Sequence, residues 1–164
     1  MSQEKNKPRS VSQELHLKKI LVPTDFSDPS ENAIRYALCL AKHFDAEITL
    51  LTVMETKSIG GAVAVSALLA DSAAERKAAK TKLRALSSLV QMEERPEIKT
   101  SIRTGVAAGE IVAEAKKLKT DLIVIATHGY TGWKHACLGS TAEHVVRTAP
   151  CPVFVVREKE HEFI

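Results

Sequence analysis

The chain contains few aromatic residues and few cysteines. Aromatic residues make up 4% of its 164 residues, so we do not expect a stacking platform for single-stranded nucleic acid. The three cysteines, Cys39, Cys137 and Cys151, form no Cys-x-x-Cys pair. An odd number of scattered cysteines fits a reducing compartment better than a disulfide framework. We therefore expect a cytoplasmic protein, in which Cys39 and Cys151 have buried or structural roles.

Long apolar segments and a strong charge of one sign are also missing. No apolar run approaches the roughly 20 residues that a membrane helix needs, and the first residues lack the apolar core of a signal peptide. The net charge of +3 is too small to argue for nucleic acid on electrostatics alone. We predict no membrane and no nucleic-acid partner. The length and the hydrophobic content of 45% suit one domain with a sizeable core.

Several signatures of enzymes are absent from the sequence. We find no G-x-x-x-x-G-K-[ST] phosphate loop, no G-x-G-x-x-G fingerprint and no G-x-S-x-G elbow. His128, His135 and His144 match no zinc spacing, and no pair of carboxylates stands out as an acid and a base. We expect no metal site and no catalytic residues.

The sequence alternates between strand-like and helix-like segments after residues 1–17, which are polar and which we expect to form a flexible tail. Predicted strands cover Ile20–Val22, Glu47–Val53, Ile98–Arg103, Asp121–Ala126 and Val153–Val156. Predicted helices cover Asp28 to about Phe44, Asp71 to about Met92, Ala108–Leu118 and Thr141–Thr148. Asp28 is the expected cap of the first helix, with Pro29 in its first turn and Glu31 in a capping box. Thr56–Ser66 has no clear assignment and is a candidate for a loop that moves.

This alternation predicts an α/β fold. Five strands separated mostly by helices indicate a single-domain, open, parallel five-stranded sheet with helices on both faces, formed by residues 18–164. Ligands of such sheets bind beyond the carboxyl ends of the strands, near the point where the strand order reverses. The loops after the first and the fourth strand are therefore the candidate site.

Both loops carry residues that suit a nucleotide. Asp25 follows the first strand, where its carboxylate accepts hydrogen bonds from ribose hydroxyls or an amino group, or serves only as a turn residue; position alone favours neither. Gly129 and Gly139 lie in the other loop and allow close approach of the backbone, and the start of the next helix offers N–H groups to an anion. Ser140 and Glu143 also have the spacing of a capping box, so Ser140 has a second, purely structural interpretation.

At these residues the chain resembles the universal stress protein family, from about Lys18 to Arg157. The opening Ile20-Leu-Val-Pro-Thr-Asp25-Phe-Ser is similar to the family's first strand and acidic residue, and Ala149-Pro-Cys-Pro-Val-Phe-Val-Val156 is similar to its last strand. The nucleotide-binding branch has the pattern G-x-x-G, nine residues, then G-[ST]. Gly129, Gly139 and Ser140 match it, whereas Ala126 stands at the first glycine.

The resemblance implies a Rossmann-like fold that binds ATP, with or without Mg²⁺, and that dimerises with a second copy through the last strand. The implied nucleotide-binding residues are Pro23, Thr24, Asp25, Val53, Ala126, Thr127, His128, Gly129, Gly132, Gly139, Ser140 and Thr141. Among them Asp25 would contact ribose or adenine, and Val53 would line the adenine pocket. The leading hypothesis is a stress-related adenine-nucleotide switch that acts on an unknown protein partner. A weak ATPase and a nucleotide-independent dimeric scaffold are the alternatives.

Overall fold

The computed structural model describes residues 15–55, 64–91, 96–127 and 138–157. In these ranges the strands are β1 (Lys19–Pro23), β2 (Glu47–Met54), β3 (Ile98–Thr104), β4 (Leu122–Ala126) and β5 (Val153–Val156). The helices are α1 (Asp28–Phe44), α2 (Ala64–Gln91), α3 (Ala107–Leu118) and α4 (Ser140–Thr148). Strands and helices therefore alternate along the chain, as the sequence predicted.

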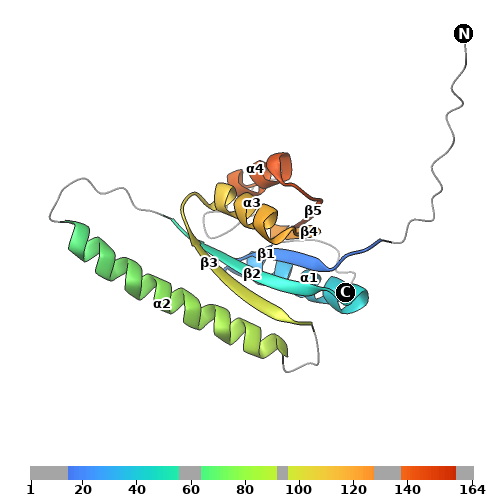
Figure 1. The fold of residues 1–164 in the computed structure, drawn as a ribbon, viewed down its shortest axis with the longest axis horizontal. Helices are drawn as coiled ribbons and strands as arrows, with labels where there is room; N and C mark the ends of the chain where they lie inside the picture. Colours follow the sequence, from blue (N-terminus) through green and yellow to red (C-terminus); the bar gives the residue numbers. More distant parts are fainter. Residues whose placement is uncertain (1–14, 56–63, 92–95, 128–137, 158–164) are drawn as a thin grey trace, which may run out of the picture.

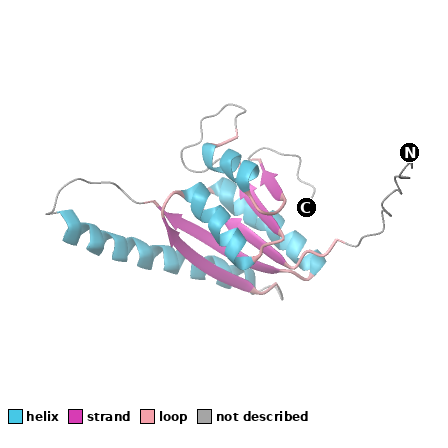
Figure 2. Ribbon diagram, turned by 45° about the horizontal axis from the view of Figure 1, so that its top comes forward, coloured by secondary structure: helices cyan, strands magenta, loops and turns pink. Residues whose placement is uncertain are grey.

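The strands form one parallel sheet in the order β3-β2-β1-β4-β5 (Figures 1 and 2). The chain moves outward from β1 through β2 to β3, returns to β4 beside β1, and moves outward again to β5. The direction of winding therefore reverses between β1 and β4. The predicted sheet is confirmed. In sheets of this kind ligands bind where the strand order reverses, which here is at the carboxyl ends of β1 and β4.

Helices cover both faces of the sheet, and β1, β2, β4 and β5 each contribute to both layers of the core. In β1, Ile20 and Val22 pack into the cluster that contains α1 and Leu83 of α2, whereas Leu21 packs into the cluster that contains α3 and α4. This alternation follows from the two-residue period of a strand, and burial on both faces explains the continuous apolar runs of the sequence. Figure 1 shows α3 and α4 on one side of the sheet and α2 on the other.

Helix α1 begins as predicted but with a different cap. Ser27, not Asp28, is the N-cap, and its side chain accepts a hydrogen bond from the Ser30 N–H. The predicted capping box of Asp28 and Glu31 is therefore wrong. The physical reason lies in the preceding turn, where Asp25 binds both the N–H and the hydroxyl of Ser27 and so ends the extended segment at that residue.

Two other predicted boundaries change. Helix α2 already begins at Ala64, so the last residues of the unassigned segment Thr56–Ser66 are helical; residues 56–63 lie outside the described ranges. Leu17 is buried against the core, so the packed part of the chain starts before the predicted domain boundary at residue 18.

Among the described residues, no helix combines the length and the apolar character that crossing a membrane requires.

The cysteines differ from one another in environment. Cys39 is exposed on α1, so the prediction that it is buried was wrong. Cys151 is half-buried and packs against the cluster beneath α3 and α4. Burial raises the pKa of the Cys151 thiol, and the negative charge of Asp121 raises it further. Cys151 therefore favours the protonated, unreactive form; Cys137 lies outside the described residues.

Candidate functional site

The turn after β1 holds the carboxylate of Asp25 in place. One oxygen, Oδ1, accepts a hydrogen bond from the Ser27 N–H at 3.1 Å and a second from the Ser27 hydroxyl. Asp25 itself is exposed. The interpretation of Asp25 as a turn residue is therefore correct for Oδ1. The same hydrogen bonds fix the position of an exposed carboxylate at the edge of the sheet where β1 ends.

Thr24 holds this turn in place through its backbone and its side chain. Its N–H donates to the Leu51 carbonyl at 2.8 Å, which continues the pairing of β1 with β2. Its buried hydroxyl accepts from the Phe26 N–H at 3.0 Å and shares a hydrogen bond of 3.0 Å with the Ser30 hydroxyl. Phe26 adopts a left-handed conformation with φ of 65°, which costs roughly 1–2 kcal/mol in a residue with a side chain. The hydroxyl network holds the backbone in that conformation.

Ser27 is a positioning residue that the sequence reasoning missed. It is 4% exposed, caps α1 and orients Asp25 with the same side chain. The signal was present in the sequence, because an Asp followed two residues later by Ser is typical of turns in which the carboxylate binds the backbone.

On the other side of the reversal, Gly139 lies directly at the end of β4. Its N–H donates to the Thr127 carbonyl at 2.9 Å, and the Thr127 N–H donates to the Val156 carbonyl at 2.9 Å. Gly139 is the N-cap of α4 and has φ of −60°, a conformation that any residue adopts. The backbone conformation at this position therefore does not require glycine.

The first turn of α4 presents unbonded N–H groups. Among the described residues, no acceptor is found for the N–H groups of Ser140, Thr141 and Ala142, and the cap provides no side-chain bond to them. The capping box of Ser140 and Glu143 is not formed, because Ser140 is the first helical residue and Glu143 pairs with Arg147 at 2.9 Å. Ser140 is therefore not the N-cap of α4, and the structure leaves these three N–H groups without an acceptor among the described residues.

The register of the sheet brings these two sets of residues together. Ile20 and Leu21 pair with Leu122 and Ile123, so β1 and β4 are neighbours that end at the same edge. Adjacent strands lie about 4.8 Å apart. The turn at Asp25, with its carboxylate, and the start of α4, with its N–H groups, therefore lie at the same edge of the sheet.

Val53 and Ala126 occupy the ends of their strands but face different layers. Val53 lies two residues beyond Leu51, the register partner of Pro23, and packs half-buried on the α3 and α4 side. Ala126 packs into the core on the α1 side. The methyl group that replaces the first glycine of the family pattern is thus accommodated within the core.

Part of the predicted site lies outside the described residues: His128, Gly129 and Gly132 fall within 128–137. Of the described residues, no group of three His, Cys, Asp or Glu side chains is arranged to hold a metal ion. The described half of the site thus consists of Pro23, Thr24, Asp25, Val53, Ala126, Thr127, Gly139, Ser140 and Thr141.

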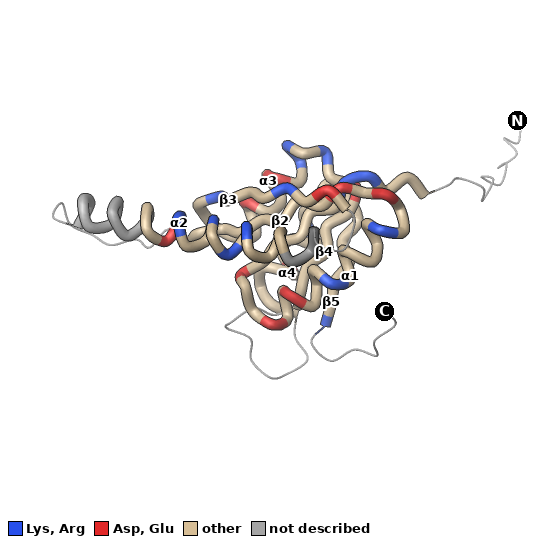
Figure 3. The backbone as a smooth tube through the Cα atoms, turned by 90° about the horizontal axis from the view of Figure 1, so that it is seen from below, with Lys and Arg blue, Asp and Glu red and all other residues tan. Residues whose placement is uncertain are grey.

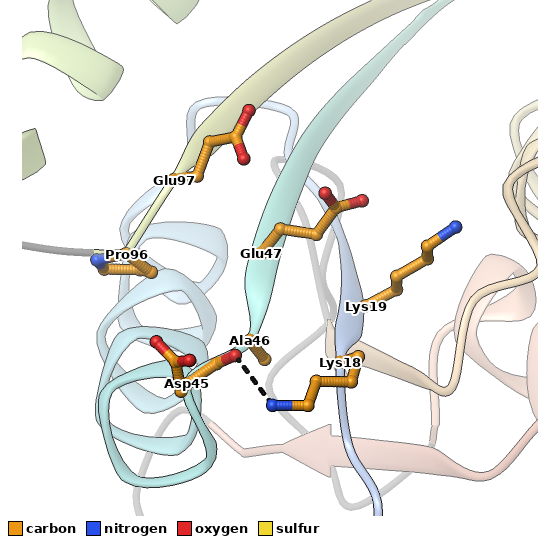
Figure 4. A pocket seen from close by; sticks show the side chains of 7 residues that line it. All are labelled: Lys18, Lys19, Asp45, Ala46, Glu47, Pro96 and Glu97. Carbon is orange, nitrogen blue, oxygen red and sulfur yellow. Dashed lines mark hydrogen bonds between the residues drawn. The ribbon is translucent and has the colours of Figure 1, made fainter.

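A second hollow of about 450 Å³ lies at the opposite edge of the sheet (Figure 4). It is lined by Lys18, Lys19, Asp45, Ala46, Glu47, Pro96 and Glu97, which precede or begin β1, β2 and β3. Both lysines of this hollow donate hydrogen bonds to main-chain carbonyls. Lys18 Nζ donates to the Phe44 and Asp45 carbonyls, and Lys19 Nζ donates to the Leu118 carbonyl. These lysines cap the carboxyl ends of α1 and α3, so this hollow has a structural explanation.

The fold is an α/β domain in which the strand order reverses between β1 and β4. A model of the universal stress protein family matches residues 16–157, and the chain belongs to that family. A universal stress protein of Methanocaldococcus jannaschii is 39% identical over 153 residues, which cover 88% of this chain and 85% of the relative. The structure of a universal stress protein from Lactobacillus plantarum has a TM-score of 0.81 at 31% identity and covers 88% of this chain and 100% of the other.

Two further solved structures share the fold at lower identity. A universal stress protein in complex with cAMP has a TM-score of 0.63 at 21% identity, covering 88% of this chain and 100% of that one. The universal stress protein from Archaeoglobus fulgidus in complex with dAMP has a TM-score of 0.64 at 19% identity, covering 87% and 99%.

Proposed function

We propose that this chain binds an adenine nucleotide at the edge between β1 and β4 and acts as a nucleotide-dependent switch for a protein partner. The observation that carries the proposal is the meeting of two features at the topological reversal. The oriented carboxylate of Asp25 stands on one side, and the unbonded N–H groups at the start of α4 stand on the other. A ribose suits the carboxylate, and phosphates suit the helix start.

The relatives support the choice of ligand. Two proteins of the same fold were solved with cAMP and with dAMP, and both ligands contain adenine, a sugar and one phosphate. Val53, half-buried at the end of β2, offers the apolar contact that an adenine ring requires in this proposal. Mg²⁺ would arrive with the phosphates of ATP, since the described residues provide no cluster that holds it alone.

The proposed switch depends on a nucleotide contacting elements on both faces of the sheet. A nucleotide would connect the β1–α1 turn, which belongs to the α1 face, with the start of α4, which belongs to the other face. Only a ligand that prefers one arrangement of these elements changes the population of that arrangement. We propose that this preference determines which partner surface is presented.

Thermal unfolding with added nucleotide tests the binding claim. At a free concentration of ATP about 100 times the Kd, binding adds about 2.7 kcal/mol to the free energy of unfolding, which raises Tm by about 5–10 °C in a domain of this size. AMP and cAMP added in parallel measure how much the phosphate chain contributes, and UTP is the control for the base. No shift with any adenine nucleotide at millimolar concentration would refute the proposal and favour a nucleotide-independent scaffold.

We also propose a homodimer through β5. This strand is at the edge of the sheet, and its residues Val153, Phe154 and Val155 are only half-buried within one copy. An apolar edge strand with unpaired backbone groups favours pairing with another strand. A second copy would cover this edge, and the test of this proposal is given below at the scale of the element.

A further inference from the structure

The exposed side of α2 carries a concentration of positive charge. Within residues 73–88, five side chains are cationic and one, Glu75, is acidic. All five cations are exposed. Lys82 lies over the Phe26 ring, with its Nζ 5.1 Å from the ring centroid, and the other four form what we call the α2 cationic stripe: Arg76, Lys77, Lys80 and Arg84. Figure 3 shows these basic positions along α2. The stripe stands out because the whole chain has a net charge of only +3.

The spacing of these residues gathers their charges on one flank of the helix. Arg76, Lys80 and Arg84 follow one another at intervals of four residues, so they lie one above the other at about 6 Å per step. The residues that face the sheet, among them Leu83 and Leu86, are on a neighbouring flank. The stripe therefore runs along the axis of α2 beside its buried face.

Nothing that the structure describes neutralises the stripe. Acidic side chains pair with Lys99, Arg103, Lys117 and Arg147 elsewhere, whereas no ion pair joins a described residue to Arg76, Lys77, Lys80 or Arg84. Like charges four residues apart weaken a helix by about 0.2–0.5 kcal/mol per pair. The fold thus carries a small cost that a partner of opposite charge would remove.

The stripe also lies on a part of α2 that protrudes. The side chains of residues 73–78 are all exposed, and Figure 1 shows the first part of α2 extending past the sheet. Because this part of α2 is exposed, an elongated partner can lie along it beside the cations.

We propose that the α2 cationic stripe is the docking surface for an acidic helical segment of another protein. The complementarity is specific: Glu or Asp side chains at four-residue intervals on a parallel-running helix match Arg76, Lys80 and Arg84 step for step. A membrane surface fits less well, because interfacial helices need bulky apolar side chains and the large exposed hydrophobics of the described residues, Leu15, Val106 and Val146, all lie outside α2. Nucleic acid fits less well because residues 73–88 contain no aromatic or amide side chain to contact bases.

The experiment measures binding of a fluorescein-labelled helical peptide with Glu at every fourth position and Ala and Gln between, by anisotropy without nucleotide at an ionic strength of about 0.15 M, where charges more than about 8 Å apart are largely screened. Three proteins are compared: the unmodified chain, the variant R76Q/K80Q/R84Q, and the control K42Q/K116Q/K119Q. The control removes the same number of charges from exposed lysines of α1 and the end of α3. Gln favours helices as Lys and Arg do, so both variants are expected to fold, which circular dichroism verifies.

We expect the stripe variant to bind the acidic peptide about tenfold more weakly than the unmodified chain, since each exposed ion pair contributes little alone. The control should bind within a factor of about two, because its charges act only at long range and are screened. Equal weakening of both variants, or none, would overturn the proposal. Tighter binding of duplex DNA or of phosphatidylserine vesicles to the same three residues would also overturn it in favour of that partner. Because nucleotide is absent, this result is independent of whether the proposed nucleotide site is correct.

Discussion

At the scale of the residue, the candidate site depends on a serine that performs two tasks. The Ser27 hydroxyl accepts from the Ser30 N–H and donates to Asp25. The cap of α1 and the orientation of the carboxylate are therefore one arrangement. A change at Ser27 should disturb helix stability and ligand affinity together.

Ser27→Ala tests this connection. Loss of an N-cap side chain costs about 1 kcal/mol, which lowers Tm by about 2–4 °C, and we expect affinity for ATP to fall in the same variant because Asp25 loses the hydrogen bond from the Ser27 hydroxyl. Ser27→Thr keeps the hydroxyl and should restore both properties. If Ser27→Ala unfolds at the temperature of the unmodified chain, the cap seen here does not stabilise the helix.

The local bonding around the candidate site depends on more than the sequence pattern shows. Asp25, Gly139, Ser140 and Thr141 were proposed as site residues from their position next to strands and helices, and this assignment stays a prediction. The spacing of Asp25 and Ser27 indicates the turn, but it does not decide between Ser27 and Asp28 as the cap, because both residues are good caps. The Gly139 N–H is taken by the Thr127 carbonyl, a contact between segments that the sequence pattern does not connect.

At the scale of the element, the least expected feature is a buried charge between β3 and α3. Glu114 is 2% exposed; its Oε1 accepts from the Ser101 hydroxyl at 2.9 Å and lies 3.4 Å from Lys117 Nζ. Arg103 Nη1 lies 3.7 Å from Oε2, and Arg103 Nε donates to Glu110 at 2.8 Å. The hydrogen bond and charge of Glu110 raise the pKa of the Arg103 guanidinium, which remains fully charged at neutral pH.

Glu114→Gln should weaken the attachment of α3 to β3. The amide keeps the shape of the side chain but removes the negative charge that faces two cations. Loss of a buried, charge-assisted hydrogen bond costs about 1–3 kcal/mol, which denaturant titration measures directly. Glu143→Gln is the matched control, because its pair with Arg147 is exposed on both sides and should contribute little. Equal stabilities of the two variants would contradict a stabilising role for the buried carboxylate.

Strand β5 allows the proposed dimer to be tested without damaging the sheet. The carbonyls of Pro152 and Val156 accept from residues of β4 and of the segment after it, so the backbone of Val155, between them, points to the open edge. Val155→Pro removes only an outward N–H group, a change that edge strands tolerate. We expect this variant to be monomeric by sedimentation equilibrium.

The control for this experiment is Val155→Thr, which has a similar shape and keeps the N–H group. It should associate as the unmodified chain does. A monomeric unmodified chain, or a dimer that survives Val155→Pro, would show that β5 is not the interface.

The elements themselves were the most predictable part of the molecule. The periodicities located every strand and helix within a few residues, apart from the start of α2. That helix continues to Ala64 through a segment rich in Gly, Ala and Val, where the amphipathic pattern is weak. Without a buried face to impose a period, the sequence alone does not locate the beginning of such a helix.

At the scale of the whole molecule, the order of the strands determines where a ligand can bind. The reversal between β1 and β4 places the Asp25 turn and the start of α4 at one edge, although more than a hundred residues separate them in the sequence. The general rule for parallel sheets predicted this edge. The orientations of the side chains at that edge, such as the packing of Ala126 into the core, depend on tertiary contacts that the sequence pattern does not reveal.

The central claim is that a nucleotide's phosphates occupy the space in front of Gly139. Isothermal titration of ATP into Gly139→Asp and Gly139→Asn tests it most directly, because both residues are preferred at an N-cap and fit the φ of −60° found there. A carboxylate at about 4 Å from a phosphate repels it by about 1–4 kcal/mol, so Gly139→Asp should bind ATP about ten- to a hundredfold more weakly than Gly139→Asn. Equal affinities of the two variants for ATP, with the fold intact, would contradict the claim.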